Sequence, residues 1–416
     1  MKKIKIGIFG CGPRGKSFIP SLLFLDCEIV ALCEKREKHL KEAQKAVGGN
    51  VATFTDFDEF IKTKMDAVIL TNYFHEHAPY AIKCFERGIH VLSECISNST
   101  MAEGVRLIRA FEKSKSIYML AENYPQMKFN REMQRIAEGG TLGKILYAEG
   151  EYNHPVSPVD AKFYKTYTYS PLHWRNYLPS TYYITHSLGP IMRATGATPK
   201  KVTAFPVYAP AASDRPTAKH VGDRAAVMTT LNDDGSVFKF VGCSGFGAHG
   251  NSYRLCGENG QIENVRGMGE KVMLRYNPWN APEGMNEVNL YDPEWNDKDE
   301  KLIETSGHGG ADFVTLRMFV ECVKNGTQPR HPFDIYSAVA MSSTAILAHR
   351  AVINGGGTYE IPDFKTEEAR KAYENDEDTP FYGSNSEKPT IPCCSNPDYA
   401  PTEKQVSDYF EMIKED

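Results

Sequence analysis

Hydrophobic and polar positions alternate at the start of the chain in a pattern typical of a β-strand. Ile4, Ile6 and Ile8 share one face of this predicted strand, and a glycine-rich turn and a helix over 16–25 follow it. Short apolar runs then alternate with amphipathic helical stretches as far as residue 121. This alternation with short connections predicts an α/β domain with a parallel, doubly wound sheet.

From about residue 124 the pattern changes to consecutive strand-like runs rich in Val, Tyr, Phe and Thr. Tight turns such as 232–235 join these runs, which is typical of a largely antiparallel sheet. Helices are predicted over 313–324 and 334–352. These features predict a second domain of the α+β class, with a large, mostly antiparallel, open-faced sheet.

Three regions result from these patterns. Residues 1–123 are predicted to form the doubly wound domain, and residues 124–358 the α+β domain. Residues 359–416 are acidic and contain several prolines. This last region is expected to be an arm that wraps its own domain or a partner subunit, or else a partly disordered tail.

The glycine-rich turn carries the first candidate chemistry. Its sequence contains Gly10-x-Gly12-x-x-Gly15 between a strand and a helix, which is the setting of a Rossmann dinucleotide-binding motif. Pro13 and Arg14 lie within the motif and are expected to contact the cofactor as well. The helix amino end offers N–H groups and a positive dipole to phosphates. The alternative is a glycine-rich turn in another kind of βαβ unit.

The end of the second predicted strand indicates which dinucleotide is bound. Glu34 stands about 20 residues beyond the glycines, where an acid suits the two ribose hydroxyls of an adenosine. The same acid would repel a 2′-phosphate, so NAD is favoured over NADP.

Ligands of doubly wound sheets bind beyond the carboxyl ends of the strands. Polar and aromatic residues follow several predicted strands here and are candidates for cofactor binding: Thr71, Asn72, Phe74, His75, His77, Glu94, Cys95 and Asn123. The two histidines are expected to line the nicotinamide pocket. Trp174 and Arg175 in a later loop either cover the nicotinamide or form ordinary packing with a surface charge.

Composition excludes several classes of function. The chain has 416 residues, 41% of them hydrophobic, and a formal net charge of −5. This charge argues against a nucleic-acid partner and an anionic membrane surface. No apolar run reaches the length of a membrane span, and no signal peptide is recognised. The ten cysteines are scattered without zinc-like spacing. We therefore expect reduced thiols, no metal site and a cytoplasmic location.

Over roughly residues 3–355 the chain resembles the Gfo/Idh/MocA family of NAD(P)-dependent sugar-handling enzymes. The resemblance rests on the glycine motif, on the block 71–77 and on the block 88–94. Family members commonly carry Glu-Lys-Pro after the fifth strand, where the lysine assists proton transfer. Here the triplet is Glu94-Cys95-Ile96, so the lysine is missing.

A narrower resemblance is to glycoside hydrolase family 109, the NAD-dependent α-N-acetylgalactosaminidases. Residues 183–190 are similar to its Tyr-x-Thr-His-Gly-Leu-Gly-Pro motif, and residues 307–313 resemble its Gly-His-Gly-Gly-Met-Asp-Phe stretch. Those enzymes also lack the lysine. Ser187 replaces a glycine of the motif, and Cys95 a valine.

This resemblance implies a small-molecule sugar or glycoside as the substrate. It implies a glycosidase cycle of oxidation at C3, elimination of the C1 group, hydration and re-reduction. Tyr183 and His186 are the catalytic candidates, with either one handling the C3 hydroxyl proton. The substrate candidates are Tyr152, His154, Thr185 and His308. Family members often pair through the open face of the second sheet, so a dimer or tetramer is expected.

Other interpretations stay open at this point. Thr185 is also a candidate helix cap, with His186 a buried, hydrogen-bonded residue, and His308 also suits the ordering of a glycine turn. The aromatic stretch 163–169 is either a wall that stacks on sugar or an irregular loop. At the level of function, the alternatives to a glycosidase are a plain NAD-dependent dehydrogenase of a sugar, glycoside or polyol, and a non-catalytic NAD-binding sensor.

Overall fold

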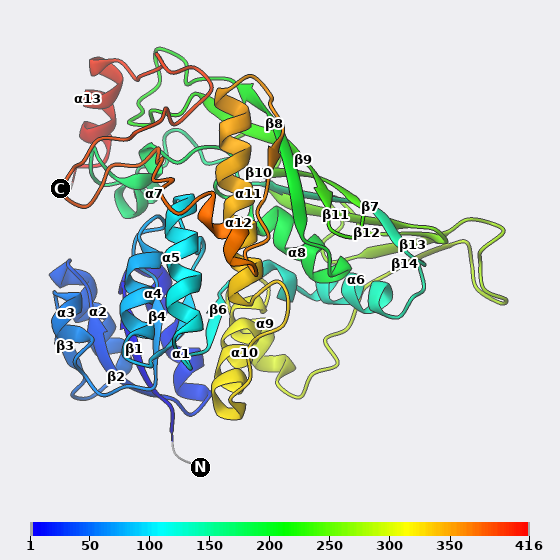
Figure 1. The fold of residues 1–416 in the computed structure, drawn as a ribbon, viewed down its shortest axis with the longest axis horizontal. Helices are drawn as coiled ribbons and strands as arrows, with labels where there is room; N and C mark the ends of the chain where they lie inside the picture. Colours follow the sequence, from blue (N-terminus) through cyan, green and yellow to red (C-terminus); the bar gives the residue numbers. More distant parts are fainter. Residues whose placement is uncertain (1–2, 415–416) are drawn as a thin grey trace.

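The structure is a computed structural model and is described here for residues 3–414. Its first layer system is a six-stranded parallel sheet with the strand order β3-β2-β1-β4-β5-β6 (Figure 1). The strands are β1 (Lys5–Phe9), β2 (Glu28–Cys33), β3 (Ala52–Phe54), β4 (Ala67–Leu70), β5 (His90–Ser93) and β6 (Tyr118–Leu120). The helices are α1 (Pro13–Phe24), α2 (Glu37–Val47), α3 (Phe57–Phe60), α4 (His77–Phe85) and α5 (Met101–Glu112). The predicted Rossmann architecture is confirmed.

The second sheet has nine strands in the order β14-β13-β12-β11-β7-β10-β9-β8-β15. Its pairs are antiparallel except for β7 with β10, which are parallel. The strands are β7 (Ile145–Asn153), β8 (Pro199–Tyr208), β9 (Asp223–Asn232), β10 (Val237–Ser244), β11 (Gly250–Gly257), β12 (Gly260–Asn264), β13 (Val272–Tyr276), β14 (Val288–Tyr291) and β15 (Tyr359–Glu360). The mostly antiparallel α+β part is therefore also confirmed.

Helices connect the two sheets and cover one face of the second sheet (Figure 1). They are η1 (Tyr124–Gln126), α6 (Lys128–Glu138), α7 (Ala161–Tyr167), η2 (Trp174–Asn176), α8 (Thr185–Thr195), α9 (Glu300–Thr305), α10 (Ala311–Asn325) and α11 (Ile335–Ile353). In this arrangement α8 contacts β7, β10 and β11, whereas α10 packs on α1 of the first domain. The amino end of α8 and the amino end of α10 therefore both lie near the junction of the two sheets.

Two local expectations need correction. The stretch 163–169 is largely the helix α7, because Asp160 caps the segment by accepting a hydrogen bond from the Phe163 backbone N–H. The helix α8 begins at Thr185 itself, so Thr185 does not cap it, and His186 lies in its first turn. None of the helices within residues 3–414 has the length and apolar character needed to cross a membrane.

The carboxyl-terminal segment packs back onto its own chain. It begins as the edge strand β15, continues through α12 (Glu367–Lys371) and ends with α13 (Glu403–Met412). The Arg370 guanidinium binds Glu112 at the end of α5, and Phe381 is buried against the ring of His75 at 4.8 Å. Residues 361–414 therefore strap both parts of the molecule together, as the upper part of Figure 1 shows.

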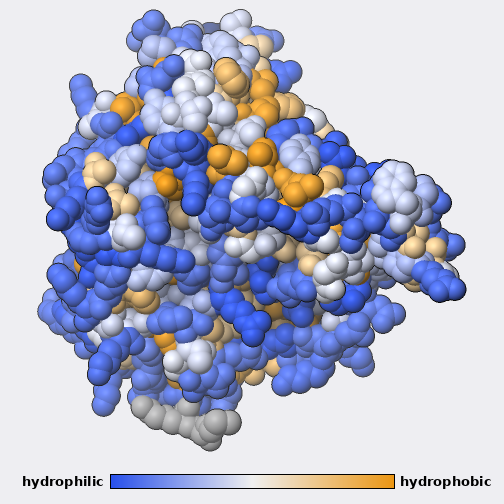
Figure 2. All heavy atoms as spheres, turned by 45° about the vertical axis from the view of Figure 1, so that its right-hand side comes forward, coloured by the Kyte–Doolittle hydropathy of each residue, from blue (hydrophilic) through white to orange (hydrophobic). Residues whose placement is uncertain are grey.

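The other face of the nine-stranded sheet remains open. Phe205 and Val227 are cross-strand neighbours there and stay 60% and 38% exposed. Figure 2, which brings the right-hand side of Figure 1 forward, shows hydrophobic side chains gathered among hydrophilic ones on this side. Pairing of subunits through this face stays a prediction.

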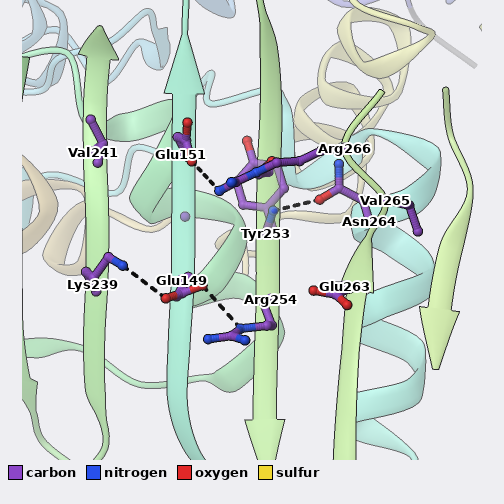
Figure 3. A pocket seen from close by; sticks show the side chains of 12 residues that line it. Glu149, Glu151, Lys239, Val241, Tyr253, Arg254, Glu263, Asn264, Val265 and Arg266 are labelled. Carbon is purple, nitrogen blue, oxygen red and sulfur yellow. Dashed lines mark hydrogen bonds and ion pairs between the residues drawn. The ribbon is translucent and has the colours of Figure 1, made fainter. Parts of the chain in front are cut away.

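A hollow of about 370 Å³ lies on the same sheet, over β7, β10, β11 and β12. Its charged groups neutralise one another, because Glu149 binds Lys239 at 3.2 Å and Arg254 at 3.1 Å (Figure 3). Arg266 pairs with Glu151 beside them. Because its charges are already paired, this hollow is a poor candidate for a catalytic site.

Candidate functional site at the junction of the two sheets

The glycine turn after β1 has the shape that a dinucleotide phosphate requires. Gly10 has φ = +93°, and a Cβ there would lie 2.4 Å from the backbone of Thr71. A Cβ on Gly15 would lie 2.0 Å from the Gly10 oxygen, whereas a Cβ on Gly12 would meet only His39, at 3.9 Å. Gly10 and Gly15 thus allow close packing, and Gly12 leaves the space above the turn open to a phosphate.

The groups around this turn suit NAD. Helix α1 starts at Pro13 with no side-chain cap, so its amino end remains available to an anion. Glu34 accepts hydrogen bonds from the backbone N–H groups of Cys11 and Arg36, both at 2.9 Å. Its carboxylate is therefore held at the edge of the turn, where the ribose hydroxyls of an adenosine would bind. The donor set fits NAD, with Glu34 opposing a 2′-phosphate.

We expect the protein to bind NADH at least tenfold more tightly than NADPH, because Glu34 repels the added phosphate. Replacing Glu34 by Ser should remove most of this preference without unfolding the protein. Titration of both nucleotides by their fluorescence measures the effect. Glu37→Ser is the matched control, since Glu37 begins α2 and pairs only with Lys41 on the surface. Equal NADH and NADPH affinities in the wild-type protein would contradict the assignment.

An aromatic stack joins the first sheet to the α8 segment. The ring of Phe74, after β4, lies 4.9 Å from Trp174 and 5.4 Å from Tyr183, nearly parallel to both. The Arg175 guanidinium covers the outer face of Trp174 at 4.3 Å. The structure therefore brings together predicted cofactor residues and the predicted catalytic tyrosine, although Phe74 and Tyr183 lie far apart in sequence.

The imidazole ring of His186 is held in place by several neighbours. Its Nδ1 lies 2.9 and 3.0 Å from the two carboxylate oxygens of Glu122, which is fully buried after β6. The ring of Tyr124 stacks on it at 3.8 Å, and Tyr253 donates a hydrogen bond to its carbonyl at 2.5 Å. Ring position, tautomer and orientation are thus imposed by the neighbours of His186.

The charge on Glu122 is stabilised by these contacts. Burial alone would raise the pKa of this carboxyl group, but the charge and hydrogen bond of His186 hold it below its usual value. Cys95 donates a thiol hydrogen bond to Oε2 of the same carboxylate at 3.3 Å. A buried carboxylate on one imidazole nitrogen leaves the other nitrogen, Nε2, as the group able to exchange a proton with a ligand.

A second charged cluster lies beside the first. Arg14 binds Glu94 at 2.6 Å and Asp312 at 2.8 Å, which ties the glycine turn to the start of α10. Asp312 also contacts His308 Nδ1 at 2.9 Å and accepts a hydrogen bond from Asn123 at 2.7 Å. Although burial opposes ionisation, the contacts with His308 and Arg14 strongly lower the pKa of Asp312. Arg14 and His308 are therefore engaged with protein carboxylates.

The remaining substrate candidates gather around His186. The buried ring of Tyr152, near the end of β7, lies 5.0 Å from His186 and 6.2 Å from Tyr183. His154 follows at 5.6 Å from Tyr152, and its Nδ1 is buried without a hydrogen-bond partner. Thr185 is buried next to His186 in the chain. Together these side chains form the α+β wall of the site.

Several predicted cofactor residues have structural contacts. His77 is buried and its Nδ1 lies 2.9 Å from the Ile96 oxygen, whereas His75 stacks on Phe381 of the strap. Burial lowers the pKa of His75 to about 4. Thr71 donates a hydrogen bond to the Gly10 oxygen at 2.5 Å, and Asn72 donates one to the Glu76 oxygen. These contacts shape the strand end. His75 Nδ1 and His77 Nε2 have no hydrogen-bond partner among the described residues, and lining of the nicotinamide pocket by these histidines stays a prediction.

Three residues of the site were not among the sequence-based candidates: Glu122, Tyr124 and Asp312. Glu122 and Tyr124 flank the candidate Asn123, and Asp312 lies in the same stretch, 307–313, as His308. Glu122 is an acid just beyond a buried strand, which was the available signal. Within residues 3–414 no group of three or more His, Cys, Asp or Glu side chains is arranged to hold a metal ion. The histidines at 154, 186 and 308 therefore do not form a ligand set.

Comparison with known proteins agrees with this geometry. Residues 4–122 match the oxidoreductase family with an NAD-binding Rossmann fold, Gfo/Idh/MocA. The fold as a whole is similar to that of levoglucosan dehydrogenase in complex with NADH and levoglucosan, with a TM-score of 0.72, 16% identity and coverage of 87% of this chain and 100% of that one. An oxidoreductase from Agrobacterium radiobacter in complex with NAD+, L-tartaric acid and magnesium gives a TM-score of 0.68 at 14% identity, covering 86% and 99%. The class is thus an NAD-binding oxidoreductase fold.

The second half of the chain narrows this class. Residues 252–371 match the glycosyl hydrolase 109 C-terminal domain. A glycosyl hydrolase family 109 protein of Streptomyces filamentosus is 24% identical, covering 93% of this chain and 81% of that protein. One from Bacteroides thetaiotaomicron is 23% identical, covering 88% and 85%. The chain thus combines a Gfo/Idh/MocA NAD-binding Rossmann domain with a glycosyl hydrolase 109 C-terminal domain.

Proposed function

We propose that this protein is an NAD-dependent glycosidase that cleaves a sugar glycoside through oxidation at C3, elimination of the C1 group, hydration and re-reduction. The observation that carries the proposal is the buried Glu122–His186 pair, next to Tyr183 and beside the NAD-type strand ends. When bound, NAD supplies the hydride acceptor of the first oxidation and the hydride donor of the last reduction.

His186 is proposed as the general base of the cycle. It accepts the C3 hydroxyl proton when C3 is oxidised and passes that proton to solvent. It then removes the C2 proton, which is acidic only after C3 has become a ketone. Glu122 fixes the imidazole through Nδ1 and stabilises the positive charge that develops when Nε2 accepts a proton. Glu122 itself does not touch the substrate in this proposal and is a positioning residue.

Tyr183 is proposed as a neutral hydrogen-bond donor. Burial, followed by the negative charge of neighbours such as Glu94, raises its pKa well above the ordinary value, although Arg175 opposes the shift. The phenol therefore keeps its proton at neutral pH and holds the sugar oxygen at C3 rather than acting as a free tyrosinate. In this proposal Tyr183 holds the C3 oxygen and His186 accepts the protons.

The residue at the position of the family's lysine supports cleavage over simple dehydrogenation. Cys95 stands there, and its thiol points to Glu122. Burial and the charges of Glu122 and Glu94 raise the pKa of this thiol well above its ordinary value. The thiol therefore cannot exchange protons as a lysine does at a substrate alcohol. Proton transfer then depends on His186, which also suits removal of a C2 proton.

One assay tests this function. Incubation of the NAD-loaded protein with aryl glycosides in deuterated water should release the phenol and place deuterium at C2 of the sugar. Release without deuterium would contradict the elimination step. NADH formed in proportion to the sugar, with no phenol released, would instead show a plain sugar or glycoside dehydrogenase. Absence of NAD binding would overturn both functions.

A further inference from the structure

Positive groups lie on the sugar side of the site, and no carboxylate within residues 3–414 pairs with them. Arg175 is half-buried, with its guanidinium 4.3 Å from the Trp174 ring and 5.5 Å from the Tyr167 ring. Both contacts are aromatic, and no ion pair forms within the described residues. An arginine held between aromatic rings is well prepared to bind an anion from the solvent side.

Lys219 belongs to the same surface. Its loop is tied to the η2 turn, because the His220 backbone N–H donates a hydrogen bond to the Asn176 oxygen at 2.8 Å. Lys219 is exposed, yet the protein around it partly desolvates its ammonium group and lowers its pKa. The positive charges of Arg175 and Arg224 lower it further, while Cys243 opposes them. Lys219 thus lies in a loop next to the η2 turn, close enough to Arg175 and Arg224 for their positive charges to act on its ammonium group.

Two histidines border this surface. The rings of His154 and His249 are 4.9 Å apart in an edge-to-face arrangement. Burial lowers the pKa of His154 to about 4, and the neighbouring His249 and Arg175 contribute to the shift. The buried Nδ1 of His154 has no hydrogen-bond partner within residues 3–414. A bound polar ligand would satisfy this nitrogen.

The acids of the site do not compensate these charges. Glu94 and Asp312 bind Arg14, and Glu122 binds His186, on the side of the first sheet. The site is therefore divided, with paired charges toward the nicotinamide end and unpaired positive charges toward the β7 and β10 ends. Positive groups that repel one another are stabilised when an anion binds among them.

We propose that the substrate sugar carries an anionic substituent, a carboxylate, phosphate or sulfate, which Arg175 and Lys219 bind opposite Glu122. The proposal rests on the function above, because it assumes that a sugar occupies the site. Arg175 supplies the planar donors that suit an oxyanion, and Lys219 supplies a mobile point charge. A neutral sugar of the same configuration would leave both cations without a partner.

Binding to the NADH-loaded protein tests this proposal without requiring turnover. Isothermal titration compares methyl glycosides of glucose, galactose and mannose with their uronic acid, 6-phosphate and 6-sulfate counterparts, in both anomers. We expect at least one anionic compound to bind roughly tenfold or more tightly than its neutral counterpart. High salt should reduce this preference, since the cations are partly exposed. The three anionic series identify which oxyanion is preferred.

Variants locate the preference. Lys219→Gln should reduce the anionic-to-neutral affinity ratio about tenfold while NADH remains bound, and Arg175→Gln should reduce the same ratio about tenfold. Lys200→Gln is the matched control. Lys200 is exposed at the start of β8, whereas Lys219 lies in the loop that follows the end of that strand. Equal binding of neutral and anionic compounds, or an unchanged ratio in Lys219→Gln, would overturn the proposal. If neutral glycosides were then still cleaved with deuterium at C2, the proposed function would stand without the anionic substrate. Tight binding of an anionic sugar without phenol release would refute the glycosidase function but not the anion-binding proposal.

Discussion

Replacing His186 by alanine is expected to lower the rate of phenol release from an aryl glycoside by about 10²–10⁴-fold, the usual contribution of a general base. The variant should still bind NADH, because His186 contacts Glu122, Tyr124 and Tyr253 rather than the glycine turn. Steady-state kinetics and nucleotide titration on the same preparation separate the two effects. An unchanged rate would remove His186 from the mechanism.

Glu122→Gln is also expected to lower the rate of phenol release, but by a smaller factor than His186→Ala. The amide preserves the volume of the side chain but cannot stabilise a charged imidazole, so kcat should fall at least tenfold and its pH profile should shift. Glu103→Gln is the matched control, because Glu103 accepts hydrogen bonds from Ser99 at the start of α5 and lies in a helix-capping box. A fall in stability with an unshifted pH profile would show that Glu122 only holds the fold together.

Two alanine substitutions in the glycine turn are expected to weaken nucleotide binding for different reasons. In Gly15→Ala, the new Cβ would lie 2.0 Å from the Gly10 carbonyl oxygen, a backbone atom that cannot move away. Overpacking of this kind costs about 1–3 kcal/mol of the free energy of unfolding, and NAD binding should be lost with the turn geometry. Thermal unfolding without nucleotide measures the first effect.

Gly12→Ala should leave that free energy nearly unchanged, since its Cβ meets only His39 at 3.9 Å and its φ of −64° suits alanine. The methyl group would instead occupy the approach to the phosphates, so NADH affinity should fall at least tenfold. Nucleotide titration measures this loss. Wild-type affinity in a stable Gly12→Ala protein would show that the dinucleotide does not cross this turn.

Much of the fold could be predicted because its signals are local. Apolar runs with period two or 3.6 identify strands and helices within a few residues, and the glycine spacing specifies one turn geometry. The missed elements are those with weak local signals, such as α7 within an aromatic stretch and the short strands β14 and β15. The start of α8 was misjudged for the same reason, because Thr185 resembles a capping residue but lies inside the helix.

The candidate site could be predicted only in part, because its chemistry depends on pairs that the sequence separates. His186 and Tyr183 were candidates from their motif, yet the partner Glu122 lies 64 residues earlier. Likewise, Asp312 forms an ion pair with Arg14, which lies near the start of the chain. His75 and His77 come after the expected strand, but their contacts with Phe381 of the strap and with the Ile96 carbonyl oxygen could not be predicted from the sequence.

The sequence by itself determined the kind of molecule: a dinucleotide turn, a parallel sheet and then a mostly antiparallel one, because backbone conformation follows from local residue patterns. Only the tertiary structure decided which ionisable groups are paired and which are not. It showed Glu122 held against His186, Arg14 between two acids, and Arg175 and Lys219 without a carboxylate partner among residues 3–414. Charge, burial and proton affinity depend on neighbours brought together by folding, and these properties decide what a site can bind and which protons it can move.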